Sequence, residues 1–540
     1  MTAPRRTKKR PLRLSSLKPT RHEATNVAPK GQTALERELQ GLLVGILQGK
    51  WIRRAQNGVL VIDAKTGDTL FSYGADRQLN PASNVKLVST AAALDAVGGE
   101  FRYRTRILGP AADPVGMIPG DVFLVGNFDP TLRVEDVQGL VQALSAQGIQ
   151  VIAGDVVVGM NEARDSLGQS RLIVVVRGGE KEGDLPTVVL EPDTALFSVE
   201  NSARTTSKGR RARLEVGLRV KKNSSGERIV VAAAGRIRPG QVFKMSRTVP
   251  RPALHVGYLL RALLLQANIE VRGGVRQENA PPPVLPELAA HESLPLGVLV
   301  GKVNKPSWNF LADRVVWTAG AELFGGSPSN EKGLRAMIGF LTRIGIARNS
   351  YRLENGSGLS RSNRLSARQI IEVLTTAGRD FRIAPDFLAS LSVAGRDGTL
   401  KGRFRGHPSA GRFRGKTGTL SGVLALSGFV SIGGEDTLCF AILTNGFKNR
   451  RKQHVRSSQA AMVNAMYRYL VKRHLTEEGA LETEGLQPPP TPMLDPSSEE
   501  GESENDSLAD ETNDIKEQPG PLDEGVEGMQ PPALPILRAF

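Results

Sequence analysis

The amino-acid sequence predicts an α/β protein in which one compact unit is interrupted by a long β-rich insertion and flanked by disordered termini. Helical periodicities and strand-like runs occur together in residues 33–100 and again in residues 294–475. Between them, residues 101–293 consist mainly of short Val- and Ile-rich runs separated by Gly, Asp and Pro, a pattern typical of strands and turns. Since the first and last segments share one character, we expect them to form a discontinuous domain around one or two inserted β-rich domains.

The two ends of the chain carry opposite charges and few apolar residues. Residues 1–31 contain nine Lys and Arg against one Glu, and residues 476–540 contain 17 acidic and two basic residues. Such segments cannot bury enough apolar surface to fold, so we expect a disordered basic arm over 1–32 and a disordered acidic tail over 476–540. The formal charge is +16, and removing the tail's −15 leaves +31. That excess suits an anionic partner such as cell-wall polymer, a lipid surface or nucleic acid.

Composition argues against several classes of protein. No stretch approaches the ~18–20 consecutive apolar residues of a membrane helix, and no apolar segment follows the basic arm as an export signal requires. No basic stripe with interleaved aromatics, zinc-ligand spacing or recognition-helix pattern occurs, so we expect no nucleic-acid partner. The single cysteine, Cys439, excludes an intrachain disulfide, and the six histidines show no ligand spacing, so we expect no metal site.

The N-terminal compact segment begins with a helix and a hairpin. Over Thr33–Gln48 leucines and isoleucines repeat at helical spacing, which predicts an amphipathic helix. Asn57–Asp63 and Thr69–Tyr73 are strand-like runs joined by a turn-rich connector, so we predict a β-hairpin. Pro81-Ala-Ser-Asn then provides the start signal for a helix over Val85–Ala96, and paired glycines mark its end.

The later segments continue this alternation. One helix is predicted inside the insertion, at His255–Ala267, while the rest of the insertion has the pattern of strands. Further helices are predicted at Leu311–Leu323, Gly333–Ile344, Ala367–Thr376 and Ser458–Arg473, and strands at Val423–Ile432 and Thr437–Leu443.

Ser83-Asn-Val-Lys86 places a hydroxyl and an amine three residues apart at the start of a predicted helix, so both project from one face. A serine hydroxyl needs a base to take its proton, and a lysine can be that base when burial and a second cation depress its pKa. The helix N-terminus also favours the oxyanion that forms on acylation. The motif alone is weak evidence, because Ser15-Ser-Leu-Lys18 in the basic arm matches it by chance.

A Lys-Thr-Gly motif, Lys416-Thr-Gly418, precedes the first of the two late strands. On an edge strand facing the serine, the lysine offers a positive charge to a substrate carboxylate, Thr417 offers a hydroxyl, and glycine permits close approach of the backbone. A second match, Lys65-Thr-Gly67, lies in the hairpin connector. A phosphate-binding loop would need a glycine where Ala410 stands, so a nucleotide site is disfavoured.

Ser307-Trp-Asn309 lies between these two motifs and supplies a second hydroxyl and a carboxamide at the head of a predicted helix. Alone the tripeptide is uninformative, and its alternative role is that of a helix cap. The order of the three motifs is informative. Ser-x-x-Lys, Ser-x-Asn and Lys-Thr-Gly in this sequence form the signature of serine acyl-transferases that handle penicillin-like and D-alanyl substrates.

Five segments carry a resemblance to a known family. They are Pro81–Leu94, Asn304–Ala312, Gly356–Arg361, Val393–Leu400 and Gly415–Leu420. In this order they look like the landmarks of class C low-molecular-mass penicillin-binding proteins, which are D-Ala-D-Ala carboxypeptidases and endopeptidases. The long interval between Lys86 and Ser307 is similar to that family's inserted domains. The resemblance implies a penicillin-binding transpeptidase-like, β-lactamase-like α+β sandwich.

The resemblance also implies a role for each motif residue. Ser83 would attack the carbonyl between two terminal D-alanines with Lys86 as general base, while Lys416 keeps Lys86 neutral and attracts the substrate carboxylate. Ser307 would relay the proton to the leaving amine, and Asn309 would hold Lys86 and the substrate amide. The implied substrate-binding residues are Thr417, Gly418 and Thr419. No metal or organic cofactor is needed, and β-lactam antibiotics are expected as covalent inhibitors.

The same resemblance implies an oxyanion hole formed by the backbone N–H groups of Ser83 and Thr419. The sequence departs from the family pattern at Trp308, where Asp is frequent, and we expect this to affect substrate choice more than acylation. Peptidoglycan peptides are the implied partner, with a periplasmic or envelope location and peripheral envelope association. A catalytically silent scaffold that binds peptidoglycan is the alternative, and the intact catalytic motifs argue against it.

Overall fold

The computed structural model describes residues 33–126, 128–158, 171–207, 213–223, 226–278, 284–434 and 436–478. The predicted basic arm and nearly all of the predicted acidic tail lie outside these residues. The centre of the protein is a six-stranded antiparallel sheet with the order β18-β19-β20-β21-β1-β2. Its strands are β1 (Gln56–Asp63), β2 (Thr69–Tyr73), β18 (Ser392–Val393), β19 (Phe413–Leu420), β20 (Val423–Gly433) and β21 (Asp436–Asn445).

Strands from the two compact segments of the chain meet in this sheet. β1 pairs along its whole length with β21, so that Gln56 lies opposite Asn445. Both strands are apolar and are buried on both faces. Leu60 and Ile62 face one hydrophobic core, and the valines that alternate with them face the other. The chain therefore returns after the insertion to complete the sheet that it began.

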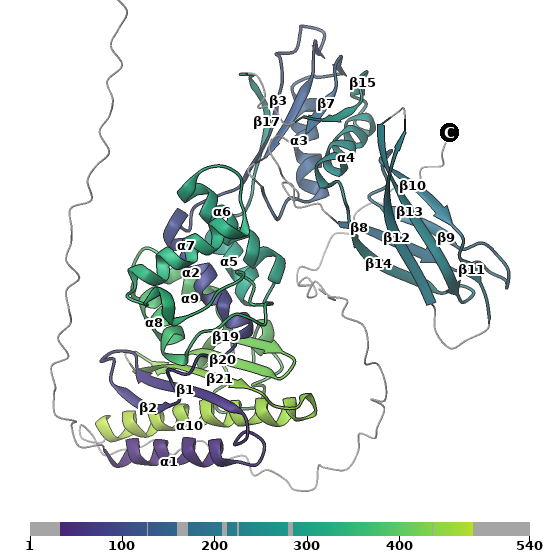
Figure 1. Cartoon of the computed structure of the whole chain (residues 1–540). Helices are drawn as coiled ribbons and strands as arrows, with labels where there is room; N and C mark the ends of the chain where they lie inside the picture. The colour runs from purple at the N-terminus through teal and green to yellow at the C-terminus, as the bar shows by residue number, and fades with distance from the viewer. Residues whose placement is uncertain are drawn as a thin grey trace, which may run out of the picture.

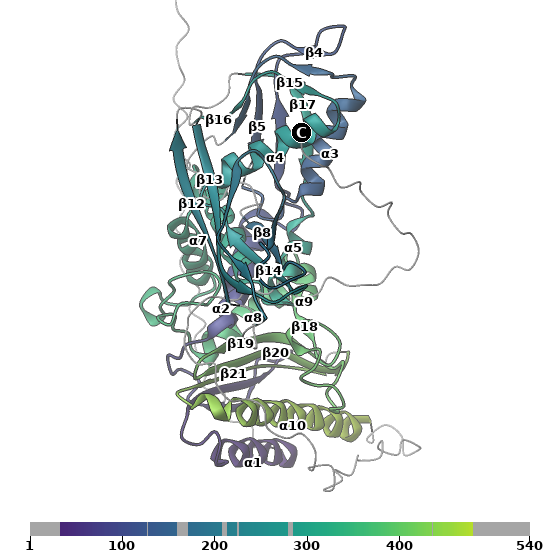
Figure 2. The same ribbon diagram turned by 90° about the vertical axis from the view of Figure 1, so that its right-hand side faces the viewer.

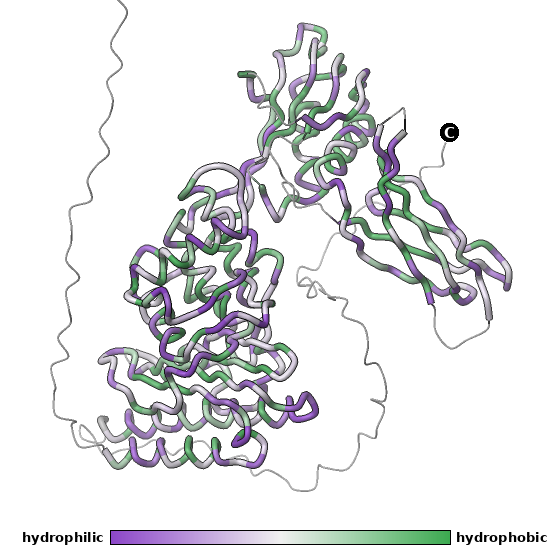
Figure 3. Tube along the Cα trace, in the orientation of Figure 1, coloured by the Kyte–Doolittle hydropathy of each residue, from purple (hydrophilic) through white to green (hydrophobic). Residues whose placement is uncertain are grey.

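Helices cover both faces of the sheet (Figure 1). α1 (Ala34–Gln48) and α10 (Lys452–Glu478) lie side by side on one face, and Figure 2 shows the same layer from a second side. Hydrophobic and hydrophilic positions alternate along both helices in Figure 3, and the buried leucines of α1 recur every four residues. The other face carries α2 (Val85–Val97), α5 (Leu296–Asn304), α6 (Asn309–Phe324), α7 (Asn330–Arg343), α8 (Ala367–Arg379) and α9 (Ala384–Ser390).

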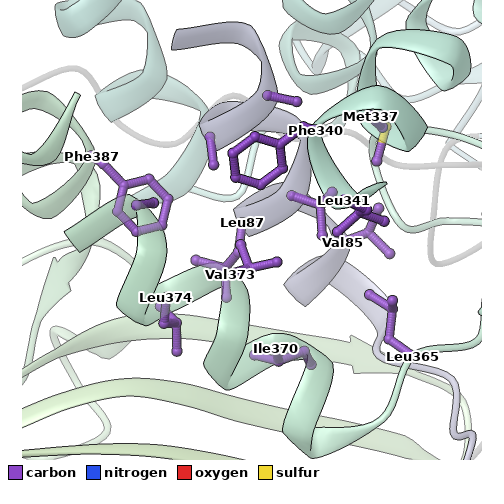
Figure 4. Packing of buried hydrophobic residues seen from close by; sticks show 14 of the residues in the cluster. Val85, Leu87, Met337, Phe340, Leu341, Leu365, Ile370, Val373, Leu374 and Phe387 are labelled. Carbon is purple, nitrogen blue, oxygen red and sulfur yellow. The ribbon is translucent and has the colours of Figure 1, made fainter. Parts of the chain in front are cut away.

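Helix α2 is the centre of that second layer and is buried on all sides. Every residue from Val85 to Leu94 is buried, including Lys86. In Figure 4 the side chains of Val85 and Leu87 lie among residues from α7, α8 and α9, such as Phe340 and Phe387. A helix that is packed on every side has little freedom to shift, so the residues at its start hold a fixed position.

The insertion forms two lobes, both visible in the upper part of Figure 1. One lobe contains a five-stranded sheet, a small three-stranded sheet and two helices, α3 (Val134–Ala146) and α4 (Pro252–Gln266). Its strands are β3 (Arg104–Leu108), β4 (Met117–Ile118), β5 (Val122–Gly126), β6 (Val151–Ile152), β7 (Val156–Val158), β15 (Glu270–Val271), β16 (Val275–Gln277) and β17 (Glu287–Glu292). The other contains β8 (Arg171–Arg177), β9 (Thr187–Glu191), β10 (Phe197–Asn201), β11 (Arg204–Thr205), β12 (Arg213–Asn223), β13 (Gly226–Ile237) and β14 (Val242–Thr248). One hydrophobic core includes residues of both lobes.

Most of the predicted elements are confirmed, with three corrections. The insertion is not uniformly β-rich, because α3 was not predicted although Val137, Leu140, Val141 and Leu144 follow helical spacing and form its buried face. α10 begins six residues before the predicted start. It also continues three residues into the segment expected to be tail. No described helix combines the length and apolar character that crossing a bilayer would need.

Candidate active site

Ser83 lies in a single 3₁₀ turn, η1 (Ala82–Asn84), that leads directly into α2. Residues beside Ser83 hold this turn against the sheet through hydrogen bonds. The Asn84 carboxamide donates to Ser427 Oγ at 2.7 Å, in the interior of the protein. One residue before the turn's entry, the backbone N–H of Asn80 donates to Asn445 Oδ1 at 2.8 Å, and Asn445 returns a bond to Asn80 O. The serine is thus fixed between a fully packed helix and the end of the sheet.

The side-chain nitrogen of Lys86 lies close to three oxygens in the interior. Lys86 Nζ lies 3.1 Å from Ser83 Oγ, 2.6 Å from Asn309 Oδ1 and 2.5 Å from the carbonyl oxygen of Ser357. A carbonyl and a carboxamide oxygen can only accept hydrogen bonds, whereas a serine hydroxyl can also donate. A neutral amine has two N–H donors and one lone pair. In the neutral form of Lys86, bonds to these two acceptors would use both donors and turn the lone pair toward the hydroxyl of Ser83.

Lys416 is the second buried amine of the site. Its Nζ donates to Ser307 Oγ at 2.7 Å and to the carbonyl oxygen of Thr417 at 3.0 Å. Burial, with the charge of nearby Lys86 as a second cause, holds the pKa of Lys416 well below its ordinary value. Two amines that share one interior therefore oppose each other's protonation. An anion bound beside Lys416 would favour its charged form.

Ser307 adopts an unusual backbone conformation, with φ of +63°. A non-glycine residue in this left-handed region costs of order 1–3 kcal/mol and persists only where its surroundings hold it. Bonds on both sides do so: Trp308 N donates to Val303 O at 3.0 Å, and Thr399 N donates to Lys305 O at 2.9 Å. Ser307 is not the cap of α6, since that position belongs to Trp308. The turn instead directs the Ser307 hydroxyl toward Lys416.

Strand β19 brings the Lys-Thr-Gly motif against the turn that carries Ser83. A Cβ atom on Gly418 would lie 2.7 Å from Pro81 O and 3.1 Å from the Cβ of Ala82, so only glycine permits this approach. The hydroxyl of Thr417 bonds to Thr399 Oγ1 at 2.8 Å, and Thr419 is exposed.

The predicted position of β19 at the edge of the sheet needs correction. The two-residue strand β18 pairs with Arg414 and Gly415, so β19 is an inner strand at its start. Because β18 is so short, the strand pairing on that side ends before Lys416. The Lys-Thr-Gly stretch therefore has the open side that a bound peptide would need.

Hydrogen bonds join the predicted catalytic residues in two groups, one of Ser83, Lys86 and Asn309 and one of Ser307 and Lys416. The two groups lie close enough for the charge of Lys86 to lower the pKa of Lys416. Sequence reasoning missed Asp313 and Ser357. Asp313 lies one turn after Asn309 on α6, and its Oδ1 accepts the Ser357 N–H at 2.7 Å. Burial raises the pKa of the Asp313 carboxyl. The spacing Asn309-x-x-x-Asp313 is the signal that could have placed both on one helix face.

Glycine residues allow the Ser357 segment to lie against the nucleophile. Gly358 has φ of +83°, and a Cβ there would lie 2.1 Å from Ala82 O. The Gly356 carbonyl accepts the Ser89 hydroxyl at 2.7 Å. Ser357 therefore serves the site through its backbone, with its N–H held by Asp313 and its C=O bonded to Lys86.

A serine hydrogen-bonded to a buried lysine, on a helix-covered antiparallel sheet with a Lys-Thr-Gly strand, defines the class of serine acyl-transferases with a penicillin-binding, β-lactamase-like fold. Within that class, the chain belongs to the D-Ala-D-Ala carboxypeptidase 3 (S13) family, whose model matches residues 39–168 and 160–468. It is therefore a serine hydrolase of the D-alanyl-D-alanine carboxypeptidase family. The predicted family is confirmed.

Two curated relatives and one solved structure illustrate this membership. The chain is 30% identical to the D-alanyl-D-alanine carboxypeptidase of Actinomadura sp. strain R39, over 76% of this chain and 81% of that one. It is 29% identical to carboxypeptidase DacB of Mycolicibacterium smegmatis, over 81% and 82% of the two chains. Penicillin binding protein 4 (dacB) from Haemophilus influenzae, solved with a β-lactam, superposes with a TM-score of 0.65 at 22% identity, covering 79% of this chain and 99% of that one. The predicted fold class is confirmed.

Proposed function

We propose that the protein cleaves the bond between two terminal D-alanines of peptidoglycan stem peptides through an acyl-enzyme on Ser83. The observation that carries this proposal is the triple contact of Lys86 Nζ with Ser83 Oγ, Asn309 Oδ1 and Ser357 O. Because the two pure acceptors use both N–H groups of a neutral amine, its lone pair is available for the Ser83 proton. Ser83 is therefore the nucleophile and Lys86 its general base.

Binding of the substrate would help to keep Lys86, the proposed base, in its neutral form. The terminal carboxylate of the peptide would lie along the open side of β19, near Thr417, Gly418 and Thr419. A carboxylate there favours the protonated form of Lys416, whose pKa is otherwise lowered by burial. A charged Lys416 in turn disfavours charge on Lys86, so the substrate itself helps to keep the base neutral.

Acylation and deacylation then follow with protons in balance. Ser83 Oγ bonds to the carbonyl carbon as its proton moves to Lys86, and the backbone N–H groups of Ser83 and Thr419 stabilise the oxyanion. The C–N bond breaks as Ser307 gives its proton to the leaving amine and takes one from Lys416, to which it is bonded. Asn309 holds Lys86 and the substrate amide. Water then attacks the ester carbonyl, its proton restores the one that Lys416 gave up, and Ser83 leaves with the proton that Lys86 had held. Loss of one oxyanion donor costs roughly 10²–10³ in turnover in a studied protease.

The proposal also covers which residues form the catalytic domain and where in the cell the protein is located. Residues 33–100 and 294–475 form the catalytic domain, and residues 101–293 form the inserted lobes. The substrate implies a periplasmic or other envelope location, with peripheral association to the envelope. β-Lactams act as covalent inhibitors of Ser83, in line with the β-lactam bound to the Haemophilus influenzae relative.

Fluorescent penicillin tests the proposal. Wild-type protein should be labelled covalently, Ser83→Ala should not, and Ser457→Ala, an exposed serine on α10, should be labelled like wild type. Release of D-alanine from a pentapeptide, compared with cleavage of cross-linked dimers, measures the preference between carboxypeptidase and endopeptidase activity. Folded wild-type protein that takes up no label would refute the acyl-enzyme and favour the scaffold alternative.

A further inference from the structure

A cluster of basic side chains gathers at one end of the central sheet, and we call it the basic end surface. It is built from residues 49–56, which lead into β1, and residues 446–457, just after β21, and neither stretch contains an acidic residue. The second stretch includes the short 3₁₀ helix η4 (Asn449–Arg451) and the start of α10. Its eight cations are Lys50, Arg53, Arg54, Lys448, Arg450, Arg451, Lys452 and Arg456.

The pairing register places the basic end surface beside the active site. Asn445, the last residue of β21, lies opposite both Gln56 of β1 and Val423 of β20. The same end of the sheet therefore holds both basic stretches and the turn that follows β19. That turn begins at Ser421, about 7 Å along the strand from Thr419.

Direct hydrogen bonds join the cluster to the catalytic segments. The Asn449 side chain, between Lys448 and Arg450, bonds to Gly422 N at 3.0 Å and to Ser421 Oγ at 2.7 Å. On the nucleophile side, Asn445 is bonded to Asn80, three residues before Ser83. A long substrate that leaves the cleft along β19 would therefore meet these cations next.

Two stacked aromatic rings, those of Trp51 and His454, lie among the cations of the basic end surface. The ring of His454 stacks on Trp51 with centroids 4.0 Å apart and planes 6° from parallel. Lys50 Nζ lies 4.5 Å, and the Arg451 guanidinium 5.9 Å, from the centre of the same ring. The indole is thus already occupied by protein groups, which leaves little of its face for a nucleic-acid base to stack on. Its role is to hold cations from the two stretches together.

The cations of this surface lack acidic partners within the described part of the chain, unlike the cations of two groups in the inserted lobes. Arg219 and Lys221 share Glu200, and Arg276 lies between three carboxylates. None of the eight cations forms an ion pair with a described carboxylate, and five of them are exposed. An uncompensated group of like charges is unfavourable by itself and is stabilised by an anionic partner.

We propose that the basic end surface binds the carboxylate-rich peptidoglycan polymer beside the peptide that occupies the cleft. This inference rests on the proposed function, because it identifies the partner by its continuity with the substrate. Stem peptides along a strand carry free carboxylates, which complement a row of cations without needing a shaped pocket. The surface would concentrate the enzyme on polymeric substrate and leave the chemistry at Ser83 unchanged.

The test compares wild type with two variants. In the first, five exposed cations of the basic end surface are neutralised; in the control, five exposed cations on another part of the protein are neutralised. The variant carries Lys50→Gln, Arg53→Gln, Arg54→Gln, Lys448→Gln and Arg450→Gln. The control carries Lys181→Gln, Arg213→Gln, Lys222→Gln, Arg236→Gln and Arg238→Gln, all exposed on the second inserted lobe. Each protein is sedimented with purified, lipid-free peptidoglycan sacculi at low and high salt. Each is also reacted with fluorescent penicillin and mixed with vesicles of anionic phosphatidylglycerol.

We expect the variant to bind sacculi more weakly than wild type by about tenfold or more at low salt, with the difference shrinking as salt screens the charges. The control should bind like wild type, and all three should react equally with fluorescent penicillin. Equal sedimentation of variant, control and wild type would overturn the inference, as would wild-type binding to anionic vesicles but not to sacculi. Absence of penicillin labelling in wild type would instead refute the proposed function, so the two failures are distinguishable.

Discussion

Asp313 bonds to the segment that contacts Lys86, the proposed general base, and two substitutions should separate its contributions. Asp313→Ala removes the acceptor of the buried Ser357 N–H, 2.7 Å away. An unsatisfied buried donor costs about 1–3 kcal/mol, so the free energy of unfolding should fall by that amount. The Ser357 carbonyl would lose its fixed position beside Lys86. The second-order rate of acylation by penicillin should then fall by about 10- to 100-fold, the equivalent of the same energy.

Asp313→Asn keeps an oxygen acceptor and removes the charge. Burial raises the pKa of the Asp313 carboxyl, so its ionised form destabilises the folded protein near neutral pH. The asparagine variant should therefore be as stable as wild type or more stable at pH 7, and this advantage should shrink as pH falls through the raised pKa and wild-type Asp313 takes up its proton. Loss of a negative charge near Lys86 should also shift the acidic limb of the acylation profile to lower pH.

Stopped-flow labelling from pH 5 to 9 and urea unfolding measure these effects. Glu372→Ala is the matched control, because burial also raises the pKa of Glu372 but no hydrogen bond links it to Lys86 among the described contacts. It should change stability and leave acylation alone. Wild-type acylation by a folded Asp313→Ala variant, across the whole pH range, would refute the role assigned to Asp313.

Four further substitutions, at three positions, test the geometry of the site and the core. Ser307→Gly should be more stable than Ser307→Ala by about 1 kcal/mol in urea unfolding, since only glycine adopts a φ of +63° without strain, while both lose peptide turnover. Gly418→Ala should slow penicillin acylation by at least about tenfold with an unchanged circular dichroism spectrum, because its Cβ would lie 2.7 Å from Pro81 O. Phe440→Ala, in the core under α10, should lower the free energy of unfolding by about 3–5 kcal/mol, and wild-type stability would contradict the packing described.

Local patterns were sufficient for the elements of the sheet and for most helices. The apolar runs around Cys439 and within Asn57–Asp63 both predicted strands, because strands buried on two faces have continuous apolar runs. No local pattern could place these strands side by side. Their pairing depends on the return of the chain after some 200 residues of insertion, which is tertiary information. Helix α3 was missed because three of its apolar residues are valines, which favour strands, in a region otherwise rich in Val and Ile runs.

The site was predictable where a motif carries chemistry in a side chain. The site was not predictable where the chemistry depends on backbone atoms. Ser83, Lys86 and Lys416 are recognisable from residue type and order, whereas Ser357 acts through its carbonyl oxygen and could be any residue of suitable conformation. Asp313 accepts a hydrogen bond from the N–H of Ser357, so its effect on Lys86 passes through the backbone of Ser357. The left-handed conformation of Ser307 was equally invisible, since the sequence there contains no glycine.

The pairing of β1 with β21 has a consequence for how the enzyme matures on the ribosome. Ser83 and Lys86 are synthesised early, yet Asn445, which is bonded to Asn80 beside them, is 365 positions later in the chain. Closing so long a separation is slow, and the inserted lobes can fold as separate units in the meantime. The nascent chain thus carries Ser83, the proposed nucleophile, for most of translation without the strand that completes the site. We therefore expect hydrolytic activity only after the last strand of the sheet has joined the first.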